Sequence, residues 1–413
     1  DRFLEMTETI APRDFRDQVL DDMDLERERG ITIKSHPVRM DYRSGDGHRY
    51  HLYLIDTPGH VDFSYEVSRS LAACEGAILL VDAAQGIQAQ TVANLYLALE
   101  ADLEIIPVIN KVDLPNADVG RCREQIVNLT GFDEDEIVKI SAKEGTGVRE
   151  LLEDIIRRIP PPEGDAAEPL RALVFDSIYN NYRGVIVYVR VFEGELRAGE
   201  KIVLMNSGSQ YEVKEIGIFK PGMEETGKLR AGQAGYIIAN IKEPSEVKVG
   251  ETITDSVRPC SHPLPGFKEL RPLVFSGLYP INTTDYEELK AALVKLRLND
   301  PSFVYQPESS QALGFGFRCG FLGLLHMDII NERLSREYDL DLITTTPSVV
   351  YEVETTDGEV MKIDNPILLP DPTRIAEIRE PFIRAFIITP NDQIGQIMQI
   401  ALDRRGTCTA TET

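Results

Sequence analysis

Three short, unbroken apolar runs constrain the fold of the N-terminal part of this chain more than any other feature. They lie at residues 51–55, 77–81 and 105–109, and stretches with helical spacing at residues 65–73 and 91–101 separate them. A strand that is apolar at successive positions is typical of a parallel sheet covered on both faces. The alternation of such strands with helices therefore predicts a doubly wound α/β domain.

The pattern changes after a proline-rich segment. Residues 159–165 have the sequence IPPPEGD, which is expected to end the last helix and to form a linker. Apolar residues then alternate with others over residues 185–192, and turns with glycine recur as far as Gly250. Many short strands with glycine turns predict a small β-barrel over residues 166–262.

The remaining residues mix strands and helices. We expect a strand at 273–276, helices at 286–298 and 321–337, a strand at 347–353, and then a further strand at 381–388 with a helix at 393–402. These elements are typical of α+β modules. We therefore divide the chain into four segments, which are residues 1–162 (α/β domain), 163–265 (β-barrel), 266–353 (α+β module) and 354–413 (a linker and the incomplete start of a second α+β module).

Composition excludes several classes of protein. The 413 residues are 42% hydrophobic and 27% charged, which is typical of a globular chain with a large core. No run approaches the ~18 apolar residues of a membrane span. The five cysteines are scattered without a CxxC pair, which indicates neither a zinc site nor a disulfide framework and fits a reducing cytosol. His326 lies among apolar helix residues and is expected to be packed rather than a ligand.

The net charge of −24 argues against a broad basic surface for nucleic acid. Contact with RNA would need local clusters of Arg and Lys, or protein partners. The chain opens with the sequence DRFLE, which has no Met and no signal-peptide features. We therefore expect that it begins inside a longer gene product.

Directly after the first apolar run stands Asp56-Thr57-Pro58-Gly59-His60. A carboxylate at the end of a buried strand can hold Mg²⁺ through a water molecule. Gly59 would allow a backbone N–H to approach a phosphate closely, and His60 could orient an attacking water. The alternative is an ordinary turn, because Asp-Thr-Pro-Gly favours turns by itself.

Two motifs that follow later strands suggest a guanine site. In Asn110-Lys111-Val112-Asp113, the Asp113 carboxylate can accept hydrogen bonds from N1–H and the 2-amino group of guanine, which adenine lacks. Asn110 could brace the loop, and the stem of Lys111 could cover one face of the base. Ser141-Ala142-Lys143 could present a backbone N–H to the guanine O6. Each motif alone could be a solvated loop, and their order after successive strands makes the set specific.

A fourth motif, Arg29-Gly30-Ile31-Thr32-Ile33, follows a charged stretch at residues 21–28. The Thr32 hydroxyl can bind Mg²⁺ while its backbone N–H contacts a γ-phosphate, and a loop held only in this way is released on hydrolysis. In isolation the segment is more typical of the start of an ordinary strand.

Together the four motifs resemble switch I, switch II and the base-recognition motifs of the translational GTPases. Within that superfamily, residues 22–33, 316–328, 336–345 and 347–351 resemble the elongation factor 4 (LepA) family. The resemblance implies a P-loop-type GTPase domain, a translation-factor β-barrel and ferredoxin-like α+β modules. It also implies an enzyme that hydrolyses GTP to GDP and phosphate and promotes back-translocation of tRNAs on the ribosome.

The resemblance assigns roles to individual residues. Thr32 and Asp56 would serve Mg²⁺ and the γ-phosphate, Asp56 through water, and His60 would be catalytic. Gly30 belongs to switch I and Gly59 to the nucleotide site. The residues of the guanine site would be Asn110, Lys111, Asp113, Ser141, Ala142 and Lys143.

The resemblance also implies partners and a location. The expected partners are the ribosome, through rRNA and proteins of its factor site, and tRNA. The expected ligands are GTP or GDP with Mg²⁺. We expect a cytoplasmic monomer without an integral membrane segment, and peripheral association with the cytoplasmic side of the cell membrane stays open.

The chain departs from the family pattern in two respects, because it lacks the phosphate loop and the C-terminal region with which the family continues. Residues 1–29 contain no GxxxxGK[ST] motif, the loop that cradles the phosphates in such enzymes. Residues 222–228 match all but its last position, where Leu229 replaces the required Ser or Thr, and we reject them because they fall in a predicted barrel turn. We expect weak or no GTP hydrolysis from residues 1–413 alone.

Two other functions would share these motifs. A translocase-type elongation factor would have a large inserted domain after the third segment, and about 30 residues between Val353 and Ile383 leave no room for one. A ribosome-assembly GTPase that uses GTP only as a switch would share every motif named above.

Overall fold

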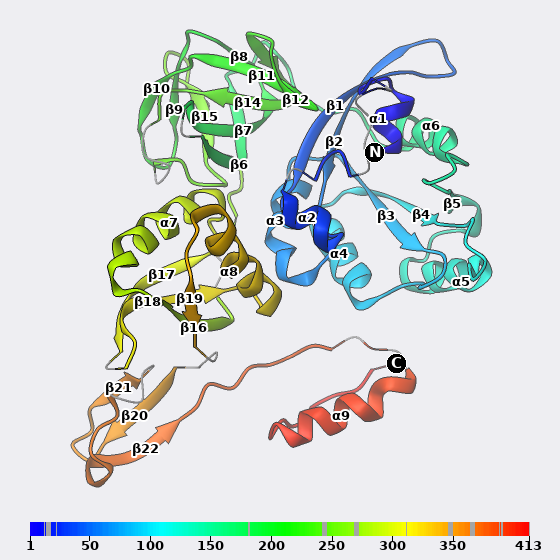
Figure 1. Ribbon diagram of the computed structural model, residues 1–413. Coiled ribbons are helices and arrows are strands. Elements are labelled where there is room, and N and C mark those ends of the chain that lie inside the picture. Colours follow the sequence, from blue (N-terminus) through cyan, green and yellow to red (C-terminus); the bar gives the residue numbers. More distant parts are fainter. Residues whose placement is uncertain are drawn as a thin grey trace. The chain divides into compact units, whose positions relative to one another are not determined.

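Figure 1 shows the computed structural model of the chain. The structure describes all residues except 12, 14–17, 22, 181, 242–245, 268–271, 311, 346–349, 364–367, 388, 390 and 413, and the side chains of 298 and 392. Residue 22 of the switch I motif and residues 347–349 of a predicted strand thus lie outside the described residues. The chain forms two compact units, Asp1–Pro347 and Ser348–Thr413.

A parallel sheet of strands β3, β4 and β5 forms the centre of the predicted α/β domain. Its strands are β3 (Gly76–Asp82), β4 (Glu104–Asn110) and β5 (Val138–Lys139). The helices of this domain are α1 (Arg2–Met6), α2 (Asp24–Arg29), α3 (Ser64–Leu71), α4 (Ala89–Glu100), α5 (Val119–Thr130) and α6 (Val148–Arg158). The register pairs Asp82 with Asn110, so both strands end at the same edge of the sheet.

Helices cover both faces of this sheet. Ile105 of β4 packs with residues of α3 and α4 on one face, and Ile109 packs there with α5. Ile106 and Val108 point the other way and pack with α1 and α6. This confirms the doubly wound arrangement.

One predicted strand lies elsewhere. Residues 51–55 form part of β2 (Arg49–Asp56), which pairs antiparallel with β1 (His36–Arg43) in a separate two-stranded sheet. None of the residues of β2 is fully buried. The prediction that this run is buried on both faces of the parallel sheet was wrong, because an apolar run indicates partial burial without identifying the strand that pairs with it.

The predicted β-barrel is present. Its ten strands among the described residues are β6 (Arg171–Asn180), β7 (Gly184–Glu193), β8 (Glu195–Arg197), β9 (Lys201–Leu204), β10 (Gln210–Glu212), β11 (Glu215–Lys220), β12 (Gly222–Glu225), β13 (Lys228–Arg230), β14 (Ala234–Ile238) and β15 (Thr252–Asp255). Eight of them form one sheet and β8 pairs with β13. The false phosphate-loop match at residues 222–228 falls on β12 and the turn to β13, as expected.

The third segment contains a four-stranded antiparallel sheet in the order β17-β18-β16-β19 and two helices. Its elements are β16 (Val274–Pro280), α7 (Tyr286–Asn299), β17 (Val304–Ser310), β18 (Gly314–Phe321), α8 (Leu324–Tyr338) and β19 (Leu342–Thr344). Phe317 and Phe321 of β18 lie in one buried cluster with Leu293 of α7 and Leu334 of α8. Helix α8 begins three residues later than predicted because β18 extends to Phe321.

The second unit contains a small sheet and one helix. Its elements are β20 (Tyr351–Thr355), β21 (Val360–Ile363), β22 (Ile375–Arg379) and α9 (Ile394–Asp403). Helix α9 confirms the helix predicted at 393–402. The strand predicted at 381–388 is absent from its described residues 381–387, where Phe382 and Phe386 are 77% and 87% exposed. Apolar β-formers do not make a strand there because no described neighbour pairs with their backbone.

Candidate nucleotide site

The loop after β2 begins with Asp56 and contains Gly59. Burial raises the pKa of the Asp56 carboxyl, and the nearby Asp21 carboxylate raises it further. A Cβ atom added at Gly59 would meet nothing within 4 Å, so the backbone is open on that side. The Gly59 carbonyl accepts a hydrogen bond from Nδ2 of Asn94 in α4, at 3.2 Å. The loop is therefore anchored on one side and accessible on the other.

His60 directly precedes the short helix η1 (Val61–Phe63). Its Nδ1 accepts a hydrogen bond from the backbone N–H of Asp62 at 3.2 Å, and 40% of its side chain is exposed. Because Nδ1 acts as an acceptor, the neutral ring bears its proton on Nε2. His60 thus presents a partly exposed imidazole with one nitrogen engaged by the protein.

Gly30 and Thr32 follow α2. Gly30 ends this helix in the left-handed region, at φ 64° and ψ 33°, which favours glycine. The Thr32 hydroxyl donates to Oδ1 of Asp21 at 3.1 Å, and Asp21 is only 7% exposed. No sequence signal points to Asp21, because it belongs to a stretch of charged residues that is typical of a solvated surface.

A second carboxylate in that charged stretch is completely buried. Glu26 of α2 accepts hydrogen bonds from the backbone N–H groups of Met23 at 3.1 Å, Ile33 at 2.8 Å and Lys34 at 3.1 Å. It therefore ties α2 to the segment that contains Thr32. The spacing of Met23 and Glu26, with an acid three residues into a helix, is the only sequence signal for this role.

The oxygen atoms of Asp21, Thr32 and Asp56 fit a magnesium ion. They are hard oxygen donors. A divalent cation would also reduce the repulsion between the two negatively charged carboxylates of Asp21 and Asp56. Among the described residues, no group of three or more His, Cys, Asp or Glu side chains could hold a metal by itself.

The two base-recognition loops are joined through Asn110. Its Oδ1 accepts hydrogen bonds from the backbone N–H of Lys111 at 2.8 Å and of Ala142 at 3.0 Å. The bracing role predicted for Asn110 is therefore compatible with the geometry. The Ala142 N–H, one of those considered for the guanine O6, is directed at Asn110 in this structure.

Asp113 and Ser141 form the second link between these loops. The buried Ser141 hydroxyl donates to Oδ1 of Asp113 at 2.6 Å and lowers the pKa of its carboxyl. Lys111 pairs with Asp82 at the end of β3, with Nζ and Oδ2 2.8 Å apart. Lys143 is exposed, and its carbonyl accepts a hydrogen bond from Arg2. All six predicted guanine-site residues thus lie in two adjoining loops at one edge of the sheet.

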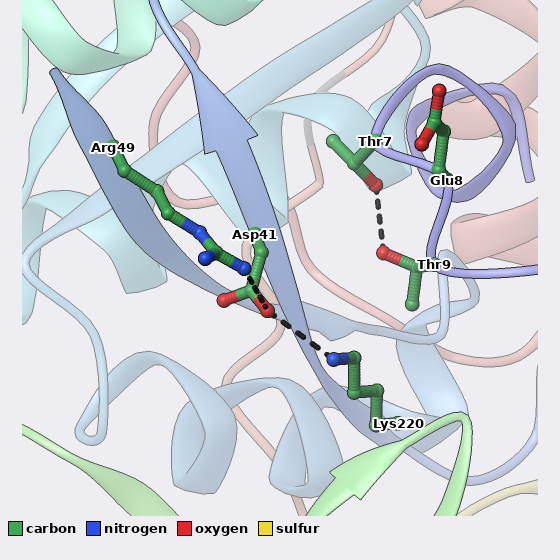
Figure 2. Close-up of a pocket in the computed structure, with 6 residues that line it drawn as sticks. All are labelled: Thr7, Glu8, Thr9, Asp41, Arg49 and Lys220. Carbon is green, nitrogen blue, oxygen red and sulfur yellow. Dashed lines mark hydrogen bonds and ion pairs between the residues drawn. The ribbon is translucent and has the colours of Figure 1, made fainter.

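A pocket elsewhere in the first unit is distinct from this site. Figure 2 shows that it lies where Asp41 of β1 and Arg49 of β2 meet Lys220 of β11. Among its described lining residues, none is a predicted site residue. Arg49 and Lys220 both pair there with Asp41, and the hydroxyls of Thr7 and Thr9 are hydrogen-bonded to each other.

Comparison with known proteins identifies the family. Residues 1–161 match the elongation factor Tu GTP-binding domain, and residues 184–254 match elongation factor Tu domain 2. The chain is 55% identical to elongation factor 4 of Halalkalibacterium halodurans over 406 residues. The aligned region covers 98% of this chain and 67% of that protein. The chain belongs to the elongation factor 4 family. Elongation factor 4 of Bacillus subtilis is 54% identical over 98% of the chain and 66% of its own length.

A solved structure shows the same fold. The crystal structure of a protein from Thermus thermophilus superposes with a TM-score of 0.66 over 88% of this chain and 69% of its own, at 19% identity. Membership of the elongation factor 4 family confirms the predicted translational GTPase architecture, with its GTP-binding domain and β-barrel. The chain spans about two thirds of the length of the curated relatives, and the roles of individual site residues stay predictions.

Proposed function

We propose that this protein is a ribosome-associated translation factor that hydrolyses GTP to GDP and phosphate and promotes back-translocation of tRNAs. The observation that supports it most is the link between the base loops, in which Asn110 binds Ala142 and Ser141 binds Asp113. Such a link is expected where both loops enclose one base. Membership of the elongation factor 4 family supports the reaction and the ribosomal partner.

Guanine is selected by Asp113. Its carboxylate accepts hydrogen bonds from N1–H and the 2-amino group, whereas adenine would leave the charge without partners. Ser141 orients the carboxylate and keeps it ionised, since its hydroxyl lowers the pKa of that group. The stem of Lys111 covers one face of the base, and the backbone near Lys143 lies beside the guanine O6.

The phosphates and Mg²⁺ are held by the loops that follow α2 and β2. Thr32 would bind the metal through its hydroxyl and Asp56 through water, and Asp21 accepts a hydrogen bond from Thr32 and acts electrostatically on Asp56. When bound, Mg²⁺ neutralises charge on the β- and γ-phosphate oxygens. The backbone N–H of Thr32 in switch I would contact the γ-phosphate, and Gly59 would let a second backbone N–H approach it without a side chain in the way.

His60 positions the attacking water. Its Nδ1 is occupied by the N–H of Asp62, so Nε2 is the nitrogen that contacts the water. Little covalent chemistry is asked of the protein in phosphoryl transfer, and the rate depends on positioning and on stabilisation of charge.

The proposed function includes a cellular setting. We expect tRNA as a further partner, a monomer and a cytoplasmic location, with peripheral membrane association untested. None of the described helices is long and apolar enough to cross a membrane.

The test uses the full-length protein with ribosomes. We expect ribosomes to stimulate GTP hydrolysis, the His60→Ala variant to lose at least about a hundredfold of that rate, and post-translocation ribosomes to move back by one codon in a footprinting assay. Stimulation by assembly intermediates but not by translating ribosomes would favour the assembly GTPase instead. Unchanged hydrolysis by His60→Ala would remove His60 from its proposed role.

A further inference from the structure

Asp62, two residues after His60, lies at the N-terminus of helix α8 in the third segment. Its Oδ2 accepts hydrogen bonds from the backbone N–H of Leu325 at 2.9 Å and of His326 at 3.3 Å. Only 16% of the Asp62 side chain is exposed. A helix of 15 residues presents free N–H groups and a partial positive charge at this end, so a carboxylate is well suited to the position.

Gly323 makes this contact possible. It occupies the position before α8 where a capping side chain usually stands, and it has none. A Cβ atom added at Gly323 would lie 2.2 Å from Oδ2 of Asp62. The cap of α8 is therefore supplied by a residue 263 positions earlier in the chain.

The same residue contacts His60. The backbone N–H of Asp62 donates to Nδ1 of His60, as described above. The buried Phe63, the last residue of η1, packs in one cluster with Ile329 of α8. The centroids of the Phe63 and His326 rings are 6.2 Å apart. The backbone that orients the imidazole is thus anchored on α8 rather than on the α/β domain alone.

Helix α8 also contacts the other nucleotide-sensing segment. Arg29 of α2 pairs with Glu332 at 2.9 Å, and Glu28 pairs with Arg336 at 2.8 Å. Leu25 and Ile33 pack in the same buried cluster as Phe63 and Ile329. One helix of the third segment therefore lies against both predicted switches.

We propose that Asp62 is a positioning residue for GTP hydrolysis, which orients His60 by anchoring its segment to the N-terminus of α8. This inference rests on the role proposed for His60. It makes the third segment part of the hydrolytic apparatus, although none of its residues touches the nucleotide.

The test varies the contact from both sides in the full-length protein with ribosomes. Gly323→Ala displaces the Asp62 carboxylate without changing the sequence of switch II, and Asp62→Ala removes the carboxylate. We expect both to lower the single-turnover rate of GTP hydrolysis by at least about tenfold while the dissociation constant for GTP changes little, because misplacement of a catalytic group by ~1 Å can cost ~100-fold. Asp62→Asn, which retains a good helix cap, should recover most of the rate lost in Asp62→Ala.

A mutant cycle separates positioning from a general loss of stability. In a His60→Ala background, Gly323→Ala should have no further effect on the rate, because the group it misplaces is gone. Asp118→Ala serves as the matched control, since Asp118 caps α5 through the N–H of Arg121 and is remote from α8. It should leave the rate of hydrolysis within about twofold of the unmodified protein.

The two proposals fail in different ways. If His60→Ala hydrolyses GTP normally, the proposed role of His60 is wrong. If His60→Ala is slow while Gly323→Ala and Asp62→Ala are as fast as the unmodified protein, or if their effects persist in full without His60, the inference about Asp62 is overturned and the proposed function stands.

Discussion

The buried carboxylate of Glu26 accepts a hydrogen bond from the backbone N–H of Ile33 at 2.8 Å, across the end of helix α2. It accepts further hydrogen bonds from the N–H groups of Met23 and Lys34. The segment with Thr32 is thereby held from inside the protein, by a residue that belongs to a stretch in which charged side chains predominate.

Removing this acceptor should destabilise the switch I segment. Glu26→Ala leaves three backbone N–H groups without their partner, which we expect to cost about 3 kcal/mol, whereas Glu26→Gln retains one oxygen and should cost about 1 kcal/mol. Urea unfolding measures the free energies, and hydrogen exchange should speed up at Ile33 and Lys34. Exchange at those two amides as slow in Glu26→Ala as in the unmodified protein would contradict this account.

Ser141 is predicted to act on guanine affinity through Asp113. Ser141→Ala removes the hydroxyl that donates to the Asp113 carboxylate at 2.6 Å. We expect GTP and GDP to bind roughly five- to tenfold more weakly, because the acceptor for the base is less well oriented. Equilibrium binding of a fluorescent GDP analogue gives the constants. Thr130→Ala, a hydroxyl deletion on α5, is the control, and equal affinity in both variants would refute the role of Ser141.

Lys34, whose side chain is 17% exposed, joins three parts of the first unit. Lys34 Nζ lies 3.3 Å from Oδ2 of Asp176 in β6, and it donates to the carbonyls of Ser177 at 3.4 Å and Asn299 at 3.2 Å. Burial lowers the pKa of Lys34, although the Asp176 carboxylate acts in the opposite direction. This side chain thus connects the segment after switch I with the barrel and with α7.

Lys34→Met should lower the free energy of unfolding by about 2–3 kcal/mol. The loss is at the lower end of the range for a broken buried ion pair because Arg69 still pairs with Asp176. Lys214→Met removes an exposed lysine that pairs with Glu212 and should change little. Equal stability of the two variants in urea unfolding would show that the Lys34 junction contributes nothing.

Acid should weaken the contact between β1 and the barrel. Burial acts to raise the pKa of Asp41, but hydrogen bonds from His51, Arg39 and Lys220 outweigh it and hold that pKa well below its usual range. Because the pKa is lower in the folded protein, the stabilisation is complete above the ordinary value of ~3.9 and is lost as the pH falls below it.

Asp41→Asn should therefore cost about 1–2 kcal/mol at pH 7 and progressively less below about pH 4. Unfolding curves of both proteins across this pH range give the difference. Asp135→Asn, at an exposed position in η2 (Glu134–Glu136), provides the control for loss of one negative charge. A difference for Asp41→Asn that does not change with pH would contradict the ion-pair account.

The sequence was sufficient to predict those parts of the site that follow buried strands. The loops with Asn110 and Ser141 come after β4 and β5, and the carboxyl ends of neighbouring parallel strands meet at one edge, so their proximity followed from topology. The doubly wound domain followed from the apolar runs at residues 77–81 and 105–109, whereas the run at 51–55 lies in a separate sheet.

The rest could not be predicted, for physical reasons. The burial of Glu26 depends on amide groups that only the folded chain brings together, and the contact between Asp62 and α8 joins residues 263 positions apart. The strand expected at residues 381–388 failed for the converse reason. Its side chains favour a strand locally, but a strand exists only when another strand pairs with it.

The central claim is that the full-length protein hydrolyses GTP whose base is bound by the Asn110 and Ser141 loops, and changing the base that these loops recognise tests it most directly. Asp113→Asn replaces one acceptor oxygen by an amide donor, which suits the 2-oxo group of xanthine in place of the 2-amino group of guanine. In the full-length protein with ribosomes, we predict that this variant loses GTP hydrolysis by at least about a hundredfold and gains hydrolysis of xanthosine triphosphate. GTP hydrolysis at the unmodified rate by Asp113→Asn would contradict the account.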